Sequence, residues 1–145
     1  MVSNAAAFDA MCLQLQRIGY DNILGYLYGG IAAWQEAGYP IRQLWQISAA
    51  ALKDKLMDGR RRLFDVRTPA EWEAGRIRQA THLPLTTLLQ QGLDAPEDEE
   101  IIVTCGVGYR GNIAASFLGA RGYRHVHSLA GGMKAWVNAG YETTT

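Results

Sequence analysis

The chain has 145 residues, and its 14 basic and 14 acidic side chains give a formal net charge of zero. This length allows one ordinary domain with an appendage, and the hydrophobic fraction of 48% is normal for a globular core. No basic run predicts a nucleic-acid partner, and no apolar stretch approaches the roughly 20 residues that span a membrane. The N-terminus lacks the pattern of a signal peptide. We therefore expect a cytoplasmic protein whose two cysteines, Cys12 and Cys105, are free thiols.

The first feature in chain order is one half of an internal repeat. Residues 29–39 (GGIAAWQEAGY) match residues 131–141 (GGMKAWVNAGY) at seven of eleven positions. Each copy is predicted to contain a short strand (23–27 and 125–129), a Gly-Gly break, a short helix centred on Trp, and a C-capping Gly. The separation of about 102 residues is that of one whole small domain and is too long for a solenoid repeat.

The second copy closes a domain, so the first copy is expected to close another. We interpret residues 1–42 as the truncated C-terminal remnant of an upstream repeat, and residues 43–145 as a complete domain. The alternative is a coincidental strand, Gly-Gly and helix pattern, which the identical positions disfavour. Apolar side chains in the remnant lack their parent core, so we expect them to bury against a partner such as a second copy of the chain.

The complete domain is expected to alternate short strands with helices. Ser48 is a predicted N-cap for a helix that Gly59 ends, and Thr68 is a predicted N-cap with Pro69 and Glu71 forming a capping box. The expected strands are 44–47, 62–66, 82–85, 101–104 and 125–129, and further helices are expected after a cap at Thr86 or Thr87, over 112–120 and over 133–138. Residues 96–100 are expected to form a solvated acidic loop. Strands separated by helices predict an α/β fold, a parallel sheet with helices on both faces.

The segment 105–110 (CGVGYR) carries the candidate chemistry. It follows the most apolar predicted strand and precedes a predicted helix. Backbone N–H groups in such a loop can form an anion-binding nest, and a helix start adds unpaired donors and the positive end of its dipole. Arg110 adds a permanent positive charge. Each of these favours the thiolate of Cys105 and predicts a nucleophilic cysteine, the alternative being an inert core cysteine.

These residues resemble a known family when they are taken together with three other segments. The segments DVRTPAEW (65–72), GRI (75–77) and ATHLPL (80–85) look like the first signature of rhodanese domains. CGVGYR resembles their active loop, and LAGGM (129–133) with Trp136 resembles their closing signature. The resemblance covers nearly all of residues 44–142 and keeps the order of the family.

The resemblance implies a rhodanese-like three-layer α/β/α fold around a central, mainly parallel five-stranded sheet. It implies sulfur transfer from thiosulfate or a persulfide to a thiol or cyanide, through a persulfide on Cys105 and without a cofactor. The residues expected to cradle the donor are Gly106, Val107, Gly108, Tyr109 and Arg110. Asp65 and Arg67 are expected to support this loop. No metal site is expected, because His82, Cys105, His125 and His127 form no recognisable zinc spacing.

Two departures from the family pattern shape these expectations. Gly106 stands where many active rhodaneses carry Arg or Lys, and Gly111 stands where many carry Ser or Thr. Less positive charge predicts modest activity with dianionic thiosulfate, and a persulfide is expected to be the better donor. The repeat also resembles tandem rhodanese domains that follow a metallo-β-lactamase-fold hydrolase in proteins similar to persulfide dioxygenases. This implies that the chain is a fragment of a larger enzyme.

Two other functions compete with sulfur transfer. A non-catalytic binding or regulatory module would keep the fold without the chemistry, although an intact Cys105 argues against it. A cysteine-dependent phosphatase or arsenate reductase is disfavoured by loop length, because phosphatases place five residues between Cys and Arg and this chain places four. A shorter loop makes a tighter cradle, which suits one sulfur better than a tetrahedral phosphate.

Overall fold

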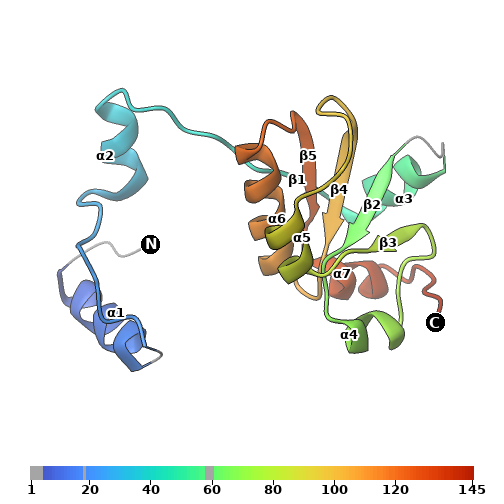
Figure 1. Cartoon of the computed structure of the whole chain (residues 1–145), viewed down its shortest axis with the longest axis horizontal. Coiled ribbons are helices and arrows are strands. Elements are labelled where there is room, and N and C mark those ends of the chain that lie inside the picture. Colours follow the sequence, from blue (N-terminus) through green and yellow to red (C-terminus); the bar gives the residue numbers. More distant parts are fainter. Residues whose placement is uncertain (1–4, 18, 58–60) are drawn as a thin grey trace. The chain divides into compact units, whose positions relative to one another are not determined.

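The computed structural model describes residues 5–17, 19–57 and 61–145, and the chain divides into two units, residues 1–43 and 44–145. The first unit contains α1 (Ala5–Arg17) and α2 (Gly30–Glu36) (Figure 1). Its described residues contain no strand, so the strand expected over 23–27 is wrong. A strand needs neighbouring strands to hydrogen-bond with, and this unit supplies none in its described part.

The second unit contains a five-stranded sheet. Its strands lie side by side in the order β1-β5-β4-β2-β3, and every paired neighbour is parallel. The strands are β1 (Trp45–Ile47), β2 (Arg62–Asp65), β3 (Ala80–His82), β4 (Glu100–Thr104) and β5 (His125–Leu129). This confirms the expected α/β fold and its five-stranded parallel sheet.

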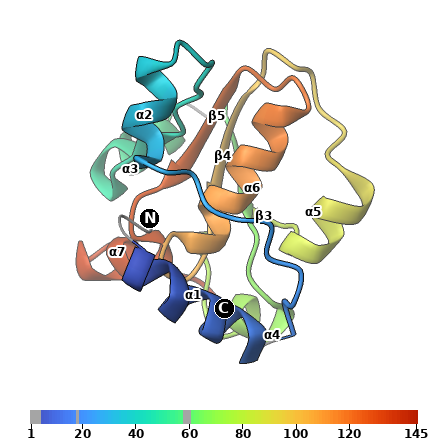
Figure 2. The same ribbon diagram turned by 90° about the vertical axis from the view of Figure 1, so that its left-hand side faces the viewer.

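Helices cover both faces of this sheet, as Figures 1 and 2 show. The helices are α3 (Ala49–Leu56), α4 (Pro69–Glu73), α5 (Leu85–Gln91), α6 (Tyr109–Ala120) and α7 (Gly132–Asn138). Because successive strand residues point to opposite faces, Ile101 and Val103 pack in one core with α5 and α6, while Ile102 packs in the other with α3 and α7. Both faces of the central strand β4 are therefore buried, which explains its continuous apolar sequence.

Several predicted element ends are confirmed and others move. Ser48 accepts a hydrogen bond from the Ala51 N–H, and Thr68 and Glu71 form the predicted capping box. α5 begins at Leu85 after Pro84, without the expected threonine cap. Glu100 is not in a solvated loop: it begins β4 and forms ion pairs with Lys55 (2.6 Å) and Arg61. Gly59, the expected end of α3, lies outside the described residues.

The two halves of the internal repeat have the same local conformation. Gly29 and Gly131, the residues before α2 and α7, have φ/ψ of 73°/−2° and 71°/0°. The indole N–H of Trp34 donates to the carbonyl six residues later at 3.0 Å, and that of Trp136 does the same at 2.9 Å. Each indole also packs on the tyrosine five residues later, with ring centroids 4.6 and 4.9 Å apart. The duplication is thus structural as well as sequential.

Candidate active site

Cys105 lies directly after β4, at the carboxyl edge of the parallel sheet where ligands of such folds bind. The turn is shorter than expected, because α6 already begins at Tyr109 and only residues 105–108 precede it. Gly108 has φ 104°, a conformation that favours glycine. Its N–H donates to the Cys105 sulfur at 3.1 Å. Tyr109 and Arg110 therefore stand in the first turn of α6, where unpaired N–H groups and the helix dipole favour an anion.

The first turn of α7 holds this turn from the other side. The Met133 N–H donates to the Cys105 carbonyl at 2.7 Å, and the Lys134 N–H donates to the Gly106 carbonyl at 3.0 Å. Gly132 lies so close that an added Cβ would stand 2.2 Å from the Cys105 carbonyl oxygen. The sequence indicates Gly132 only as part of the closing signature. In the structure, the absence of a side chain at Gly132 allows the N-terminal end of α7 to approach the backbone of Cys105.

The Cys105 side chain is closed to solvent. It is 1% exposed and belongs to the core cluster that includes Val66, Val103 and Ala114. Val107 and Tyr109 are 53% and 78% exposed, so these two residues point largely to solvent. The Gly108 N–H lies against the sulfur at 3.1 Å. In this conformation a donor molecule therefore has no direct path to the sulfur.

Arg110 forms a bidentate ion pair with Glu71 in the first turn of α4. Its two terminal nitrogens lie 2.7 and 2.6 Å from the two carboxylate oxygens. This hydrogen bonding from Arg110 holds the pKa of Glu71 down at about 2, and the pKa of Arg110 is raised in turn. An added Cβ on Gly106 would lie 3.3 Å from the Arg110 guanidinium and 3.5 Å from the carboxylate, so the pair lies beside the turn.

The contact of Glu71 with Arg110 was not predicted from the sequence, which indicated only its capping role. A signal was present in the topology. β2 and β4 are parallel neighbours, so the helices that follow them start at the same edge of the sheet. An acidic residue in the first turn of α4 is then placed to meet a basic residue in the first turn of α6.

Asp65 and Arg67 pair with each other at the end of β2. The guanidinium donates to both carboxylate oxygens at 2.7–2.9 Å and also to the Gly75 carbonyl at 2.7 Å. Asp65 is fully buried and Arg67 is 7% exposed. The pair therefore ties β2 to the turn that follows α4, the helix carrying Glu71. We call residues 105–108 the Cys105 turn. The pair is connected to this turn by a backbone hydrogen bond, which the Val66 N–H donates to the Thr104 carbonyl at 2.9 Å.

The other cysteine and one of the histidines considered in the sequence make local contacts. A ring nitrogen of His82 lies 3.0 Å from the Arg67 carbonyl, and the ring stacks on Trp72. Cys12 is a free thiol in the first unit, half-buried. Among the described residues, no group of three His, Cys, Asp or Glu side chains is placed to hold a metal ion. No helix in the described part of the chain is long and apolar enough to cross a membrane.

Residues 48–139 match the family model of the rhodanese-like domain, and the chain belongs to this family. It is 33% identical over 96 residues to a protein named sulfurtransferase from Allochromatium vinosum, a match that covers 66% of this chain and 90% of that protein. It is also 33% identical over 95 residues to a putative sulfurtransferase from Bacillus subtilis, covering 65% and 91%.

Solved structures of this family share the fold. A rhodanese-related protein from Thermoplasma volcanium superimposes with a TM-score of 0.63 at 27% identity, covering 69% of this chain and 97% of that one. The human single-domain sulfurtransferase TSTD1 superimposes with a TM-score of 0.59 at 27% identity, covering 66% and 97%. These likenesses support a protein of the rhodanese-like sulfurtransferase family.

Proposed function

We propose that this chain moves a sulfane sulfur from a persulfide or thiosulfate to a thiol or cyanide, through a persulfide on Cys105. One observation carries the proposal: the Cys105 sulfur accepts the Gly108 N–H at 3.1 Å, at the end of a central parallel strand and at the start of α6. A backbone N–H fixed against the sulfur is a preorganised donor of the kind that stabilises charge as it develops during a transfer reaction. The names of the sulfurtransferase relatives support the same reaction class.

The two half-reactions balance without an external oxidant. In the first, the Cys105 thiolate attacks the outer sulfur of R–S–S⁻, the S–S bond of the donor breaks, and R–S⁻ leaves with its electron pair. In the second, an acceptor thiolate attacks the outer sulfur of Cys105–S–S⁻, which restores the Cys105 thiolate and forms a new persulfide. With thiosulfate the first leaving group is sulfite, and with cyanide the product is thiocyanate. This is covalent catalysis with a ping-pong order.

The charges around the turn favour a donor of low charge. Arg110 is already bound to Glu71 through both terminal nitrogens, and Gly106 adds no cation. A dianionic donor therefore meets less positive charge than a single unpaired arginine would offer. We propose that a persulfide is the better donor and that thiosulfate is used slowly.

Intact mass after incubation with a low-molecular-weight persulfide tests the reaction. We expect one added sulfur on the wild type and on Cys12→Ser, none on Cys105→Ser, and its removal by cyanide. The Cys12 variant is the matched control, because it removes the chain's other thiol. Sulfur retained on Cys105→Ser, or no adduct with any donor, would contradict the proposal.

Gly106→Arg tests the charge argument. Its Cβ would meet only the ends of two long side chains, at 3.3 and 3.5 Å, and these can shift. A new charge-assisted hydrogen bond to thiosulfate should raise kcat/KM for that donor roughly tenfold, with a smaller change for a persulfide. Gly106→Gln is the control for bulk without charge. Equal effects of both variants on thiosulfate would show that donor charge does not govern the preference.

A non-catalytic binding role is the second candidate. The observation that favours it is the 1% exposure of Cys105, because a sealed sulfur cannot exchange unless the turn shifts. The mass experiment separates the two functions, since a binding module would gain no sulfur from any donor. Iodoacetamide alkylation of Cys105 in the folded protein, compared with Cys12, measures how often the turn opens.

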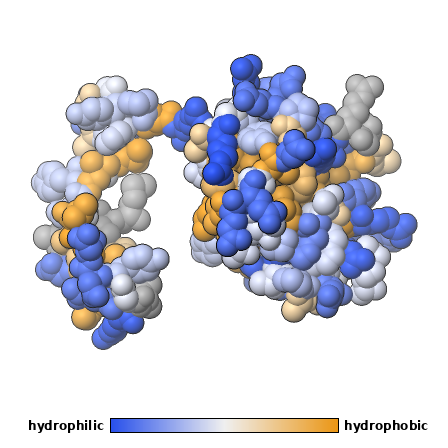
Figure 3. All heavy atoms as spheres, in the orientation of Figure 1, coloured by the Kyte–Doolittle hydropathy of each residue, from blue (hydrophilic) through white to orange (hydrophobic). Residues whose placement is uncertain are grey.

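We also propose that residues 1–42 derive from the end of a preceding rhodanese repeat, because residues 29–39 reproduce both the sequence and the conformation of 131–141. The presence of an upstream metallo-β-lactamase-fold hydrolase and the cytoplasmic location of the protein remain predictions. Apolar side chains of this unit are solvent-exposed, Leu24 at 93% and Leu27 at 48%. Figure 3 shows hydrophobic residues on the surface of this unit. We propose that they self-associate. Light scattering over a concentration series should show dimers that Leu24→Glu abolishes, and a monomer throughout would contradict this.

A further inference from the structure

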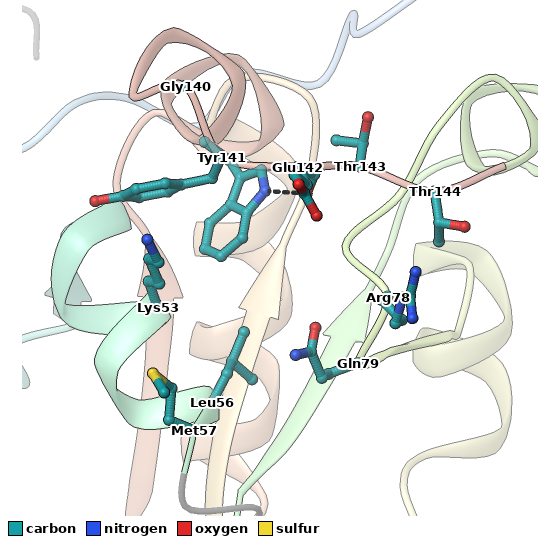
Figure 4. A pocket seen from close by; sticks show the side chains of 11 residues that line it. Lys53, Leu56, Met57, Arg78, Gln79, Gly140, Tyr141, Glu142, Thr143 and Thr144 are labelled. Carbon is teal, nitrogen blue, oxygen red and sulfur yellow. Dashed lines mark hydrogen bonds between the residues drawn. The ribbon is translucent and has the colours of Figure 1, made fainter.

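A cavity of about 540 Å³ lies in the second unit, away from the Cys105 turn. Three segments enclose it: the C-terminal end of α3, the residues before β3, and the residues that follow α7 (Figure 4). No residue of the segment 105–110 lines it. Its volume falls in the range of pockets that hold small organic ligands.

The lining mixes polar and apolar side chains, and Trp136, Leu56 and Met57 form its apolar part. Trp136 is 5% exposed, and its indole N–H is already used in the hydrogen bond to the Glu142 carbonyl. A ligand therefore meets the hydrocarbon of this ring rather than a free donor. Leu56 is half-buried beside it, and Met57 is 82% exposed at the rim. A flexible, polarisable methionine at an open rim is typical of surfaces that adapt to apolar ligands of varied shape.

Two cationic side chains line the cavity on opposite sides of its apolar part. Lys53 lies with Tyr141 on one side, its ammonium 4.6 Å from the ring centroid, and Arg78 lies on the other (Figure 4). Neither forms an ion pair with a carboxylate in the described part of the chain, unlike Lys55, Arg62, Arg67 and Arg110. Glu142 is the carboxylate among the lining residues, so the lining charges sum to a net positive value.

We propose that this cavity binds a small organic anion, a carboxylate carried on an aromatic or similarly flat apolar body. The apolar body packs on Trp136 and Leu56, and the carboxylate lies at one end of the cavity, within the positive field of the Lys53 and Arg78 side chains. Burial of the ligand's apolar body supplies most of the affinity, and the two cationic side chains supply selectivity for a negatively charged ligand. The proposal does not depend on sulfur transfer, because the site shares no residue with the Cys105 turn.

Binding of 1-naphthylacetate, with neutral 1-naphthylacetamide as the matched ligand, tests the proposal. In amide NMR spectra of the full chain, we expect the acetate to shift the Trp136 indole N–H and the backbone amides of residues 140–144. The amide should bind at least about fivefold more weakly, and Cys105→Ser should bind the acetate as the wild type does. Shifts confined to residues 105–110, or equal affinity for both ligands, would overturn the proposal.

Charge variants locate the site. Lys53→Gln and Arg78→Gln should each weaken binding of 1-naphthylacetate about two- to fivefold, and both together about tenfold, while Glu142→Gln should strengthen it. Arg124→Gln is the control, because Arg124 is an exposed arginine outside the cavity. Conserved spectra outside the cavity verify that the variants fold. Loss of affinity in Arg124→Gln equal to that in Arg78→Gln would show unspecific charge attraction and overturn the proposal.

Discussion

The two copies of the repeat share a conformation but differ in what surrounds them. In the second copy, Met133 and Trp136 are buried in a core beneath the sheet, at 7% and 5% exposure. In the first copy, Ile31 is 44% exposed and α2 has no buried residue. The Met133 and Lys134 N–H groups hold the Cys105 turn, whereas the corresponding groups of Ile31 and Ala32 make no hydrogen bond to a described residue.

This difference separates local from tertiary causes of structure. Both copies have a glycine in the left-handed conformation, a short helix, a helix C-cap and a Trp–Tyr ring contact. The eleven-residue segment therefore specifies these local features by itself. The strand forms only in the copy that has β1 and β4 as neighbours. The five-residue strand therefore forms because neighbouring strands pair with it, and its own sequence is not sufficient to form a strand.

Replacement of the two tryptophans is the strongest test of this contrast. Trp136→Ala should lower the free energy of unfolding of the second unit by about 3–5 kcal/mol, because it removes a large buried ring from a close-packed core. Trp34→Ala should cost less than about 1 kcal/mol, since Trp34 is only half-buried. Urea denaturation followed by far-UV circular dichroism measures both. Equal costs would mean that the first copy has a core of its own.

The fold was largely predictable, because its signals are local. The Ser48 cap, the Thr68 capping box and the apolar strands 62–66 and 101–104 each indicate their elements without help from distant residues. The start of α6 was less predictable. Gly108 supplies the turn and the helix begins directly after it, so Tyr109 and Arg110 belong to a helix rather than to a loop.

The partners of the candidate site could not be predicted in the same way. Gly132 and Glu71 act through contacts with residues 27 and 39 positions away, Cys105 and Arg110. No local pattern encodes such contacts. The sequence left open whether Cys105 lies in a cradle or in the core; its 1% exposure depends on tertiary contacts, including those of α7 with the turn.

Gly132→Ala should have the second largest effect. Its Cβ would lie 2.2 Å from the Cys105 carbonyl, so either α7 or the Cys105 turn has to shift, at a cost of about 1–3 kcal/mol. Uptake of sulfur onto Cys105 should fall at least about tenfold, because the donors around the sulfur move with the turn. The rate of persulfide formation, measured by intact mass, reports this.

The matched control is Gly30→Ala in the first copy. Gly30 and Gly132 have φ of 62° and 59°, so the two substitutions impose the same local backbone strain. An added Cβ at Gly132 meets the Cys105 carbonyl, whereas Gly30 belongs to the other unit of the chain. Sulfur uptake in Gly30→Ala should therefore match the wild type. Unchanged uptake in Gly132→Ala would show that α7 does not position the turn.

The smallest expected effect concerns the ion pair between Glu71 and Arg110 in the second unit. Arg110 holds the pKa of Glu71 at about 2, below its ordinary value of 4.5. The folded state therefore binds this proton less readily than the unfolded state, so the ion pair stabilises the fold above about pH 4.5 and this contribution is lost as the pH falls toward 2. Because the carboxylate side chain is 38% exposed, we expect about 1 kcal/mol or less.

Glu71→Gln measures this contribution. The difference in unfolding free energy between wild type and variant should be constant from about pH 5 to pH 8 and should shrink between pH 4.5 and pH 2. Glu73→Gln, at the exposed end of the same short helix, is the control and should show no such trend. A Glu71→Gln difference that persists unchanged at pH 2 would mean that the Glu71 side chain acts through its capping geometry and not through its charge beside Arg110.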